Sequence, residues 1–361
     1  MIKDSIDTIK LYKARTPLKK PISDATHSLH ELSFLVLRIT TKSGITGESY
    51  LLSFQYSPEA IIGAIKDIVE SARKYSIWET GKFNKEALQV DEYFGNTGVL
   101  NWARCMVNIA MWDAKGKNLG LPIHKILGIY RDKVPVYGSG GWLSYTIDEL
   151  ISEVSNYMDR GFKAVKIKVG SDNWKTDLLR LTKVREAVGK DVDIMMDANQ
   201  GMAIPDAVQL ALAAKELNIF WFEEPIHHQN FEGYQKLKEK TGISLAMGER
   251  EFDTVALREL ILKNALDIWQ PDLLRLGSVE AWLKSAALAE SFHIPVMPHY
   301  YKDYDVPLLC TIPNGAGAES FDWIDSLIDN PIKIKNGFAY PRTEPGWGFT
   351  FLDDCLEEIK L

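Results

Sequence analysis

The sequence is poor in cysteine and has no long apolar run, and both absences limit what the protein can be. The three cysteines among 361 residues, Cys105, Cys310 and Cys355, are too few and too far apart for a disulfide framework or a zinc-binding spacing. No stretch approaches the roughly 18 consecutive apolar residues of a membrane span. The segment Met1 to Lys10 lacks the apolar core of a signal peptide. These absences predict a cytoplasmic protein without a membrane partner.

An excess of positive charge is also missing. The net charge is −7, which argues against a nucleic-acid partner, because such proteins usually carry a basic face. The apolar fraction of 46% and the charged fraction of 25% are typical of globular proteins. A chain of this length usually folds as a large domain with a smaller one.

From residue 133 onward, apolar β-like runs alternate with amphipathic helices. The expected strands are Val134–Ser139, Ala164–Val169, Asp193–Asn199, Ile219–Glu223, Leu245–Glu249, Asp267–Asp272, Pro295–His299 and Gly315–Ser320. The helices between them predict parallel β/α units, and eight such strands indicate a closed (β/α)8 barrel, although the helix after His299 is poorly marked. An open doubly wound sheet is the alternative, but it would favour a glycine-rich phosphate turn whose fingerprint the segment Gly138 to Trp142 lacks.

The rest of the chain does not follow this repeat. Residues 1–132 read as an α+β domain with a strand at residues 33–40, a hairpin partner at Ile45–Leu52 and helices from about Pro58 to Gly120. We therefore divide the chain into an N-terminal domain (1–132), a barrel (133–320) and a tail (321–361). The tail contains no further β/α unit and is expected to return to the N-terminal domain.

Charged or polar side chains recur at the ends of the predicted strands, where the active sites of such barrels lie. They are Lys166, Lys168, Asp197, Asn199, Glu223, Glu249, Asp272, His299 and Glu319. No single one is diagnostic, but their recurrence at one level of the barrel is. The other histidines, including His227 and His228, read as surface or loop residues.

Lys166 and Lys168 lie two residues apart and therefore share one face of a strand. In a barrel that face points inward, whereas on an edge strand it would be a solvated basic face. Two neighbouring ammonium groups lower each other's pKa, and a lysine with a lowered pKa can act as a general base.

Asp197, Glu223 and Glu249 are equally spaced along the chain, one β/α unit apart. Three carboxylates that converge without partners would repel one another strongly. A hard divalent cation removes this repulsion, and oxygen ligands without histidine or cysteine favour Mg²⁺ over zinc. The alternative is that lysine or arginine pairs with each carboxylate. Asn199 shares the strand face of Asp197, whereas periodicity alone does not decide between Glu223 and its neighbour Glu224.

Asp272 and His299 end the sixth and seventh predicted strands. A carboxylate bonded to one imidazole nitrogen fixes the tautomer and raises the basicity of the ring. The pair is therefore expected to act as a general acid or base across the barrel mouth from the lysines. Glu319 is expected to bind a substrate carboxylate with the help of a lysine, or else to be an ion-pair partner.

In combination these motifs resemble the mandelate racemase subgroup of the enolase superfamily. The matching segments begin at Val165, Met196, Trp221, Met247, Gln270, Met297 and Ala318, and residues Ala110 to Gly128 are similar to the link from that family's capping domain. The resemblance implies Mg²⁺ held by Asp197, Glu223 and Glu249. It also implies Lys168 and His299 as bases on the two faces of a small carboxylate substrate. Lys166 and Glu319 would lie beside the carboxylate, and Asp272 would pair with His299.

Within that subgroup the sequence is most similar to acid sugar dehydratases of the talarate/galactarate type. The segment from Thr16 to Thr26 is similar to their loop over the substrate, so Lys19 and Lys20 are candidates for its distal end. The implied reaction removes the proton next to a carboxylate, forms an enediolate and expels the β-hydroxyl to give a 2-keto-3-deoxy acid. The implied alternative is racemisation of a 2-hydroxy acid, and a metal-dependent hydrolase or a binding protein fits less well. The resemblance also implies a homo-oligomer, for example an octamer.

Overall fold

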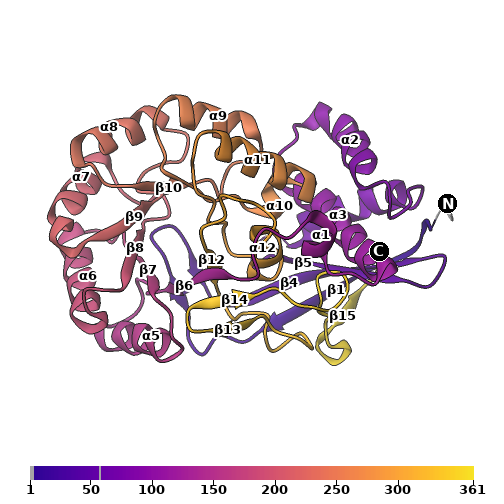
Figure 1. Ribbon diagram of the computed structural model, residues 1–361, viewed down its shortest axis with the longest axis horizontal. Coiled ribbons are helices and arrows are strands. Elements are labelled where there is room, and N and C mark those ends of the chain that lie inside the picture. The colour runs from indigo at the N-terminus through magenta and orange to yellow at the C-terminus, as the bar shows by residue number, and fades with distance from the viewer. Residues whose placement is uncertain (1–3, 57) are drawn as a thin grey trace.

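The structure is a computed structural model that describes residues 4–56 and 58–361. An N-terminal domain lies beside a larger barrel, and both ends of the chain lie on the N-terminal domain (Figure 1). Residues 1–3, part of the segment read above for a signal peptide, lie outside the described residues. The first barrel strand begins at Val134, close to the predicted boundary at residue 132.

A four-stranded antiparallel sheet underlies the N-terminal domain, in the order β15-β1-β4-β5. Its strands are β1 (Ile6–Thr16), β4 (Leu32–Thr41), β5 (Thr46–Leu52) and β15 (Glu357–Ile359). The hairpin of β4 and β5 agrees with the prediction. The sequence analysis missed β1, because the charged residues in it obscure an apolar face that becomes evident only from its burial against other elements.

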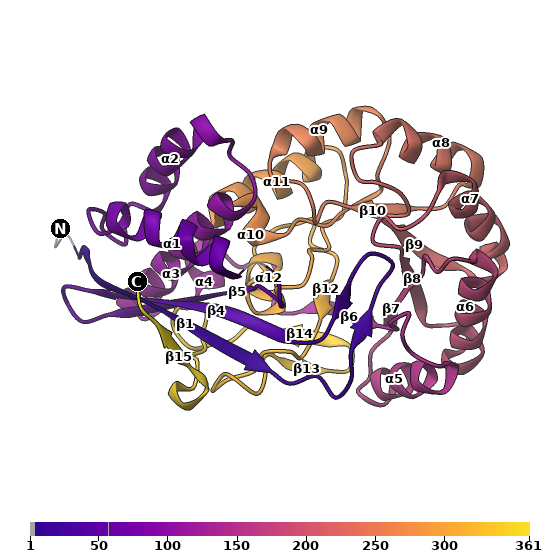
Figure 2. The ribbon, with the colours of Figure 1, turned by 180° about the vertical axis from the view of Figure 1, so that it is seen from behind.

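A short hairpin between β1 and β4 extends from this domain to the barrel. Its strands are β2 (Ile22–Ser23) and β3 (Ser28–Leu29), and we call residues 22–29 the covering hairpin. In both ribbon views the indigo segment between β1 and β4 reaches the strands β6 to β8 (Figures 1 and 2).

Helices fill the predicted helical region of the N-terminal domain. They are α1 (Pro58–Ala72), α2 (Thr80–Asp91), the 3-10 turn η1 (Glu92–Phe94), α3 (Val99–Leu119) and α4 (Ile123–Leu127). The long helix α3 contacts β5 and α1 on one side and α10 of the barrel on the other. It is therefore buried on most of its surface and joins the two domains.

The barrel contains the predicted ring of parallel strands. They are β6 (Val134–Gly140), β7 (Ala164–Lys168), β8 (Asp193–Asp197), β9 (Ile219–Glu223), β10 (Leu245–Met247), β11 (Ile268–Trp269) and β12 (Ala318–Ser320). β6 to β11 pair in chain order, and β12 pairs with β6. Val296 bridges Trp269 on one side and Gly315 on the other, so the ring closes and the barrel prediction is confirmed.

Several strands are shorter than predicted, because the backbone turns at the residues that point into the barrel mouth. The dihedral angle φ is positive at Asn199 (40°), Gly248 (139°) and Tyr300 (67°), next to predicted strand ends. The predicted strand Pro295–His299 is reduced to the single bridging residue Val296. The pairing between neighbouring β-strands therefore ends at the residues whose side chains lie at the barrel mouth.

Most barrel helices begin at a side chain that caps their free N–H groups. Thr146 and Glu149 form a capping box at α5, and Asn173, Asn230, Asp253 and Ser278 cap α6, α8, α9 and α11. The helices are α5 (Ile147–Asp159), α6 (Trp174–Val188), α7 (Ile204–Ala213) with the 3-10 turn η2 (Lys215–Leu217), α8 (Phe231–Thr241), α9 (Thr254–Leu262), α10 (Leu273–Leu276), α11 (Val279–Ser291) and α12 (Lys302–Leu309). The poorly marked helix after His299 is α12, whose pattern is obscured by Pro307 inside it.

The tail lies against both domains. Its hairpin of β13 (Lys333–Lys335) and β14 (Phe338–Tyr340) pairs antiparallel with β6, beyond which lies the turn η3 (Asp353–Cys355). The strand β15 then pairs with β1, with Ile359 opposite Leu11. The tail therefore returns to the N-terminal sheet.

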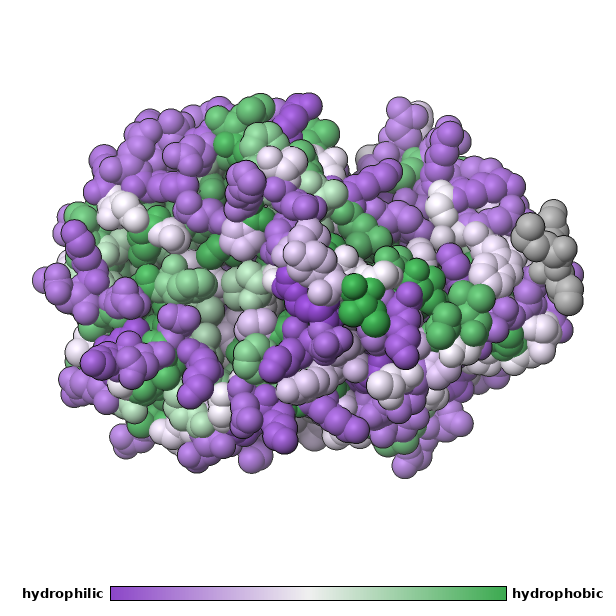
Figure 3. All heavy atoms as spheres, in the orientation of Figure 1, coloured by the Kyte–Doolittle hydropathy of each residue, from purple (hydrophilic) through white to green (hydrophobic). Residues whose placement is uncertain are grey.

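The surface is mixed in character. On the face seen in Figure 3, hydrophobic side chains form small groups between hydrophilic ones. Val90, Tyr93 and Phe94, around the end of α2, are among the most exposed large apolar residues. Of the helices described, none is long and apolar enough to span a bilayer. The homo-oligomer stays a prediction.

The close approach of β5 to α3 predicts a sharp stability effect at Gly47. A Cβ atom at Gly47 would overlap the carbonyl oxygen of Ala110, whereas a Cβ atom at Gly63 in α1 would meet nothing within 4 Å. Gly47→Ala should therefore lower the free energy of unfolding by about 1–3 kcal/mol. Gly63→Ala, the matched control, should raise it by about 0.5–1 kcal/mol. Chemical denaturation measures both, and equal effects would contradict the packing described.

Candidate active site

A cavity of about 260 Å³ lies at the C-terminal ends of the barrel strands, under the N-terminal domain. Seven of the predicted site residues line it: Lys166, Lys168, Asn199, Glu249, Asp272, His299 and Glu319. Asp197 and Glu223 do not line it, because they are buried beneath the two lysines. Lys19 and Lys20 do not line it either.

The two lysines of β7 point into the barrel and are almost completely buried. Lys166 Nζ lies 2.9 Å from both carboxylate oxygens of Glu223 and 2.6 Å from Glu319 Oε1. Lys168 Nζ donates to Asp197 Oδ2 at 2.5 Å and to Asn199 Oδ1 at 2.8 Å. The inward orientation predicted for the lysines is therefore correct.

The predicted lowering of the lysine pKa values is wrong for this structure. Burial lowers the pKa of Lys168, but the carboxylates around it, Asp197 foremost, together outweigh burial and raise it. Burial likewise lowers the pKa of Lys166, and Glu223 and Glu319 together raise it well above its usual range. The sequence analysis counted the neighbouring ammonium group and not the carboxylates that adjacent strands bring closer.

The three predicted metal ligands come from adjacent strands. Asp197 and Glu223 are directly paired in register on β8 and β9, and Glu249 follows β10. Within residues 4–56 and 58–361, no three acidic, histidine or cysteine side chains already converge as metal ligands. Each of the three carboxylates instead faces a cation, which is the alternative that the sequence analysis left open.

The charge of this cluster nevertheless fits a divalent cation. Burial and the nearby Asp197 raise the pKa of Glu223 to about 7, even though Lys166 contacts it. Asp197 and Glu223 therefore repel each other at the ends of β8 and β9. Buried oxygen donors with excess negative charge are the environment that Mg²⁺ prefers, so Asp197, Glu223 and Glu249 fit a magnesium site.

Glu224 does not line the cavity and pairs with Arg250 instead. Its φ is 35°, and its Oε2 accepts a hydrogen bond of 2.8 Å from Arg250 Nε. Burial, with the nearby charge of Glu249, raises the pKa of Glu224 to about 8. Arg250 also lies 3.2 Å from Glu249, so it joins the two acidic residues. The sequence analysis gave Arg250 no role.

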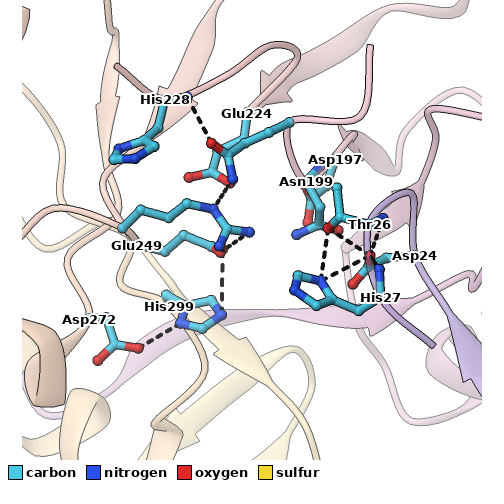
Figure 4. Close-up of polar contacts among 12 residues, drawn as sticks. Asp24, Thr26, His27, Asp197, Asn199, Glu224, His228, Glu249, Asp272 and His299 are labelled. Carbon is cyan, nitrogen blue, oxygen red and sulfur yellow. Dashed lines mark hydrogen bonds and ion pairs between the residues drawn. The ribbon is translucent and has the colours of Figure 1, made fainter. Parts of the chain in front are cut away.

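Asp272 and His299 form the predicted pair. Asp272 Oδ2 lies 2.9 Å from His299 Nδ1, while Asp272 Oδ1 accepts the backbone N–H of Arg275 and so caps α10. His299 Nε2 lies 3.5 Å from Glu249 Oε2, as Figure 4 shows. Burial lowers the pKa of His299, but Glu249 and Asp272 outweigh burial and raise it. Its neighbours therefore favour the protonated imidazolium.

Glu319 is an anion in this environment. Its Oε2 accepts the backbone N–H of Tyr300 at 2.8 Å, and its Oε1 faces Lys166. Burial raises the pKa of Glu319, but Lys166 and His299 outweigh burial and lower it. Glu319 therefore fixes both Lys166 and the backbone next to His299.

The covering hairpin supplies three cavity residues that the sequence analysis did not predict, Asp24, His27 and Leu29. Asp24 Oδ1 accepts the backbone N–H groups of Thr26 and His27 at 2.7 Å each. His27 Nδ1 lies 2.8 Å from Thr26 Oγ1, and Figure 4 shows the turn next to Asn199. Burial raises the pKa of Asp24, but the hydrogen bond with His27 and the charge of Lys168 lower it to about 2. His27 is therefore a loop residue, as expected, but it also lines the cavity, which was not expected.

The tip of the hairpin packs on two barrel glycines. A Cβ atom at Gly170 or Gly201 would overlap the methyl group of Ala25. These glycines follow β7 and β8, so the hairpin covers the mouth beside the lysines. Lys20 instead pairs with Glu149 and lies 4.5 Å from the ring centre of Tyr145, and Lys19 is exposed. The structure thus gives no support to Lys19 and Lys20 as substrate contacts.

The N-terminal domain also holds the segment that follows His299. The backbone N–H of Tyr50 donates to the hydroxyl of Tyr304 at 2.7 Å, and that of Leu52 donates to the hydroxyl of Tyr301 at 3.3 Å. Asn101 of α3 donates to the carbonyl of Arg275 in α10. Both sides of the Asp272–His299 pair are therefore anchored to the other domain.

Comparisons with known proteins agree with this geometry. Residues 149–355 match the family model for enolase C-terminal domain-like proteins, and residues 6–128 match that for the N-terminal domain of mandelate racemase and muconate lactonizing enzyme. The chain is 30% identical to the L-talarate/galactarate dehydratase of Salmonella typhimurium, over 99% of the chain and 92% of that protein. It is 29% identical to the arabinonate dehydratase of Saccharolobus solfataricus, over 100% of the chain and 99% of that protein.

A solved structure shows the same fold. The L-talarate/galactarate dehydratase of Salmonella typhimurium LT2, liganded with Mg and L-lyxarohydroxamate, matches with a TM-score of 0.93 and 29% identity. The match covers 99% of this chain and 95% of that one.

The magnesium fit predicts a selective effect of Asp197→Asn. Removal of one of three buried carboxylates should weaken Mg²⁺ affinity at least about tenfold. Asp193→Asn, at the exposed opposite end of β8, is the matched control and should leave the affinity unchanged. Calorimetric titration measures both, and equal affinities in the two variants would remove Asp197 from the ligand set.

Proposed function

Because the chain belongs to the mandelate racemase/muconate lactonizing enzyme family of the enolase superfamily, we propose that it is a Mg²⁺-dependent acid sugar dehydratase. The proposed reaction removes the proton next to the substrate carboxylate and eliminates the β-hydroxyl, which gives a 2-keto-3-deoxy acid. The observation that carries the proposal is the pairing of His299 with Asp272 in one cavity with Lys166 and Lys168. Relatives that act on acid sugars support it.

The substrate carboxylate is proposed to bind at the acidic end of the cavity. Lys166 Nζ and Glu319 would lie beside it, with Asp197, Glu223 and Glu249 as the ligands of Mg²⁺. A bound Mg²⁺ supplies positive charge where the carboxylate gains negative charge as the proton leaves. Lys166 adds a fixed ammonium group that hydrogen-bonds the same oxygens.

Lys168 and His299 are proposed to move the protons. They come from β7 and from the segment after Val296, which are different parts of the ring, so the α-carbon can lie between them. Lys168 must be neutral to accept the α-proton. Asp197 raises the pKa of Lys168 and burial lowers it. A cation bound to Asp197 would therefore lower the pKa of Lys168 and favour the neutral amine. His299, as the imidazolium, donates a proton to the departing hydroxyl.

Racemisation or epimerisation of a 2-hydroxy acid is the second candidate. The same placement of two proton carriers favours it, because either group could return the proton to the opposite face. A leaving group at the β-carbon decides between the two outcomes.

A screen with Mg²⁺ against aldonic and aldaric acids tests the proposal, with semicarbazide to detect 2-keto products. Formation of such a product from at least one acid sugar is the expected result. Exchange of the α-proton in heavy water without any 2-keto product would replace dehydration by racemisation.

Two variants should abolish dehydration while the fold remains. Lys168→Ala and His299→Asn should each lower kcat at least about a hundredfold, since each removes one proton carrier. His228→Asn is the matched control, because His228 forms a similar pair with Glu251, at 2.7 Å, but does not line the cavity. It should keep most of the activity. Steady-state kinetics and circular dichroism measure the effects, and an active Lys168→Ala/His299→Asn double variant would refute the mechanism.

A further inference from the structure

The lysine and arginine residues that line the cavity all come from the barrel. The lysine and arginine residues of the lining are Lys166, Lys168, Arg250 and Arg275. Arg275 Nη1 donates to the carbonyl of Glu249 at 2.6 Å and lies 3.8 Å from its carboxylate. Like Lys166, Lys168 and Arg250, it therefore already has an acidic partner. These cations therefore pair with the carboxylates around the place where one substrate carboxylate and the metal would bind.

The N-terminal domain forms the wall that covers the barrel mouth, which we call the cap wall. Its lining residues are Asp24, His27, Leu29, Leu51, Leu52, Ser53, Phe54, Tyr56, Ile61 and Trp102. This set contains no lysine or arginine, and its one carboxylate is that of Asp24. The carbon chain of a substrate whose carboxylate binds at the ends of the barrel strands can extend toward this wall, which lines the same cavity.

The lysines that could have served the cap wall are turned away from it. Lys20 is occupied by Glu149 on α5, and Lys19 is exposed. The polar groups that the covering hairpin brings to the cavity are the Asp24 carboxylate and the His27 ring. The Nδ1 atom of this ring is within hydrogen-bond distance of Thr26 Oγ1.

Aromatic rings complete this side of the cavity. Trp323 lies 4.3 Å from Phe321, 5.5 Å from Tyr300 and 6.1 Å from Trp142 between ring centres. Phe54 of the cap wall lies 6.1 Å from Trp323. Such rings offer apolar faces to the C–H groups of a sugar chain and no compensation for a negative charge.

We infer that the substrate carries a single carboxylate: it is an aldonic acid whose far end is an uncharged hydroxyl group, and not an aldaric acid with a carboxylate at each end. This inference rests on the proposed dehydratase function. A second carboxylate at the cap wall would be desolvated without a cation and would face Asp24, and both effects oppose its binding. A terminal hydroxyl can hydrogen-bond to His27 or Ser53 at no such cost.

The test compares pairs of acids that share every stereocentre and differ only at the terminal carbon, such as D-galactonate with galactarate and D-gluconate with D-glucarate. The full-length protein is assayed with Mg²⁺, and kcat/KM is compared only within a pair. For the configuration that reacts best, we expect the aldonate to be preferred by at least about tenfold. An equal or greater kcat/KM for the aldarate would overturn the inference and leave the dehydratase function intact.

Two variants locate the far end of the substrate. His27→Lys places a cation on the cap wall and should raise the ratio of aldarate to aldonate kcat/KM at least about tenfold. An unchanged ratio in a folded protein would overturn the inference. Lys20→Met is the matched control, and it should leave the ratio unchanged. A selective loss of aldarate turnover in this variant would show that Lys20 binds a second carboxylate. This result would also overturn the inference.

Failure of the proposed function and failure of this inference give different experimental results. If no acid sugar in any pair is dehydrated, while α-proton exchange in heavy water occurs with a 2-hydroxy acid, the proposed function fails and the inference fails with it. If dehydration occurs but favours the aldarate, only the inference fails.

Discussion

The burial of two ammonium groups among carboxylates at the barrel mouth is the constraint on which the rest of the site depends. A buried charge is tolerated only when partners hold it on several sides. Lys166 meets Glu223 from β9 and Glu319 from β12, while Lys168 meets Asp197 from β8. Strands on both sides of β7 must therefore end at the same level, which a closed ring of parallel strands ensures. Without that ring, these charges would have to be exposed to water.

The Asp272–His299 pair depends on a different kind of support. Asp272 uses one carboxylate oxygen to cap α10 and the other to orient the imidazole. α10 is held by Asn101 of α3, and the segment after His299 is held by the tyrosine contacts to β5. The N-terminal domain is therefore a structural part of the acid/base site as well as its cover.

The sequence predicted the barrel residues well, because regular spacing converts position in the chain into position in space. The equal spacing of Asp197, Glu223 and Glu249 placed them at one level, and the Lys166–Lys168 spacing placed both lysines inward. The roles of Asp24, His27 and Arg250 could not be predicted in this way, since they arise from contacts between segments that are distant in sequence. The pKa of Lys168 was mispredicted for the same reason, because its nearest charge comes from another strand. The single-residue pairing at Val296 depends on backbone turns that hydrophobic patterning does not report.

The pairing of β15 with β1 has a consequence for how the protein is made. Leu11 stands opposite Ile359, so a strand translated early lacks its neighbour while the ribosome adds the whole barrel. Until then the outer edge of β1 offers unpaired backbone groups to any other nascent chain. Such distant pairing is also slow to form. β1 is therefore an edge strand of the sheet until residues 357–359 have been made.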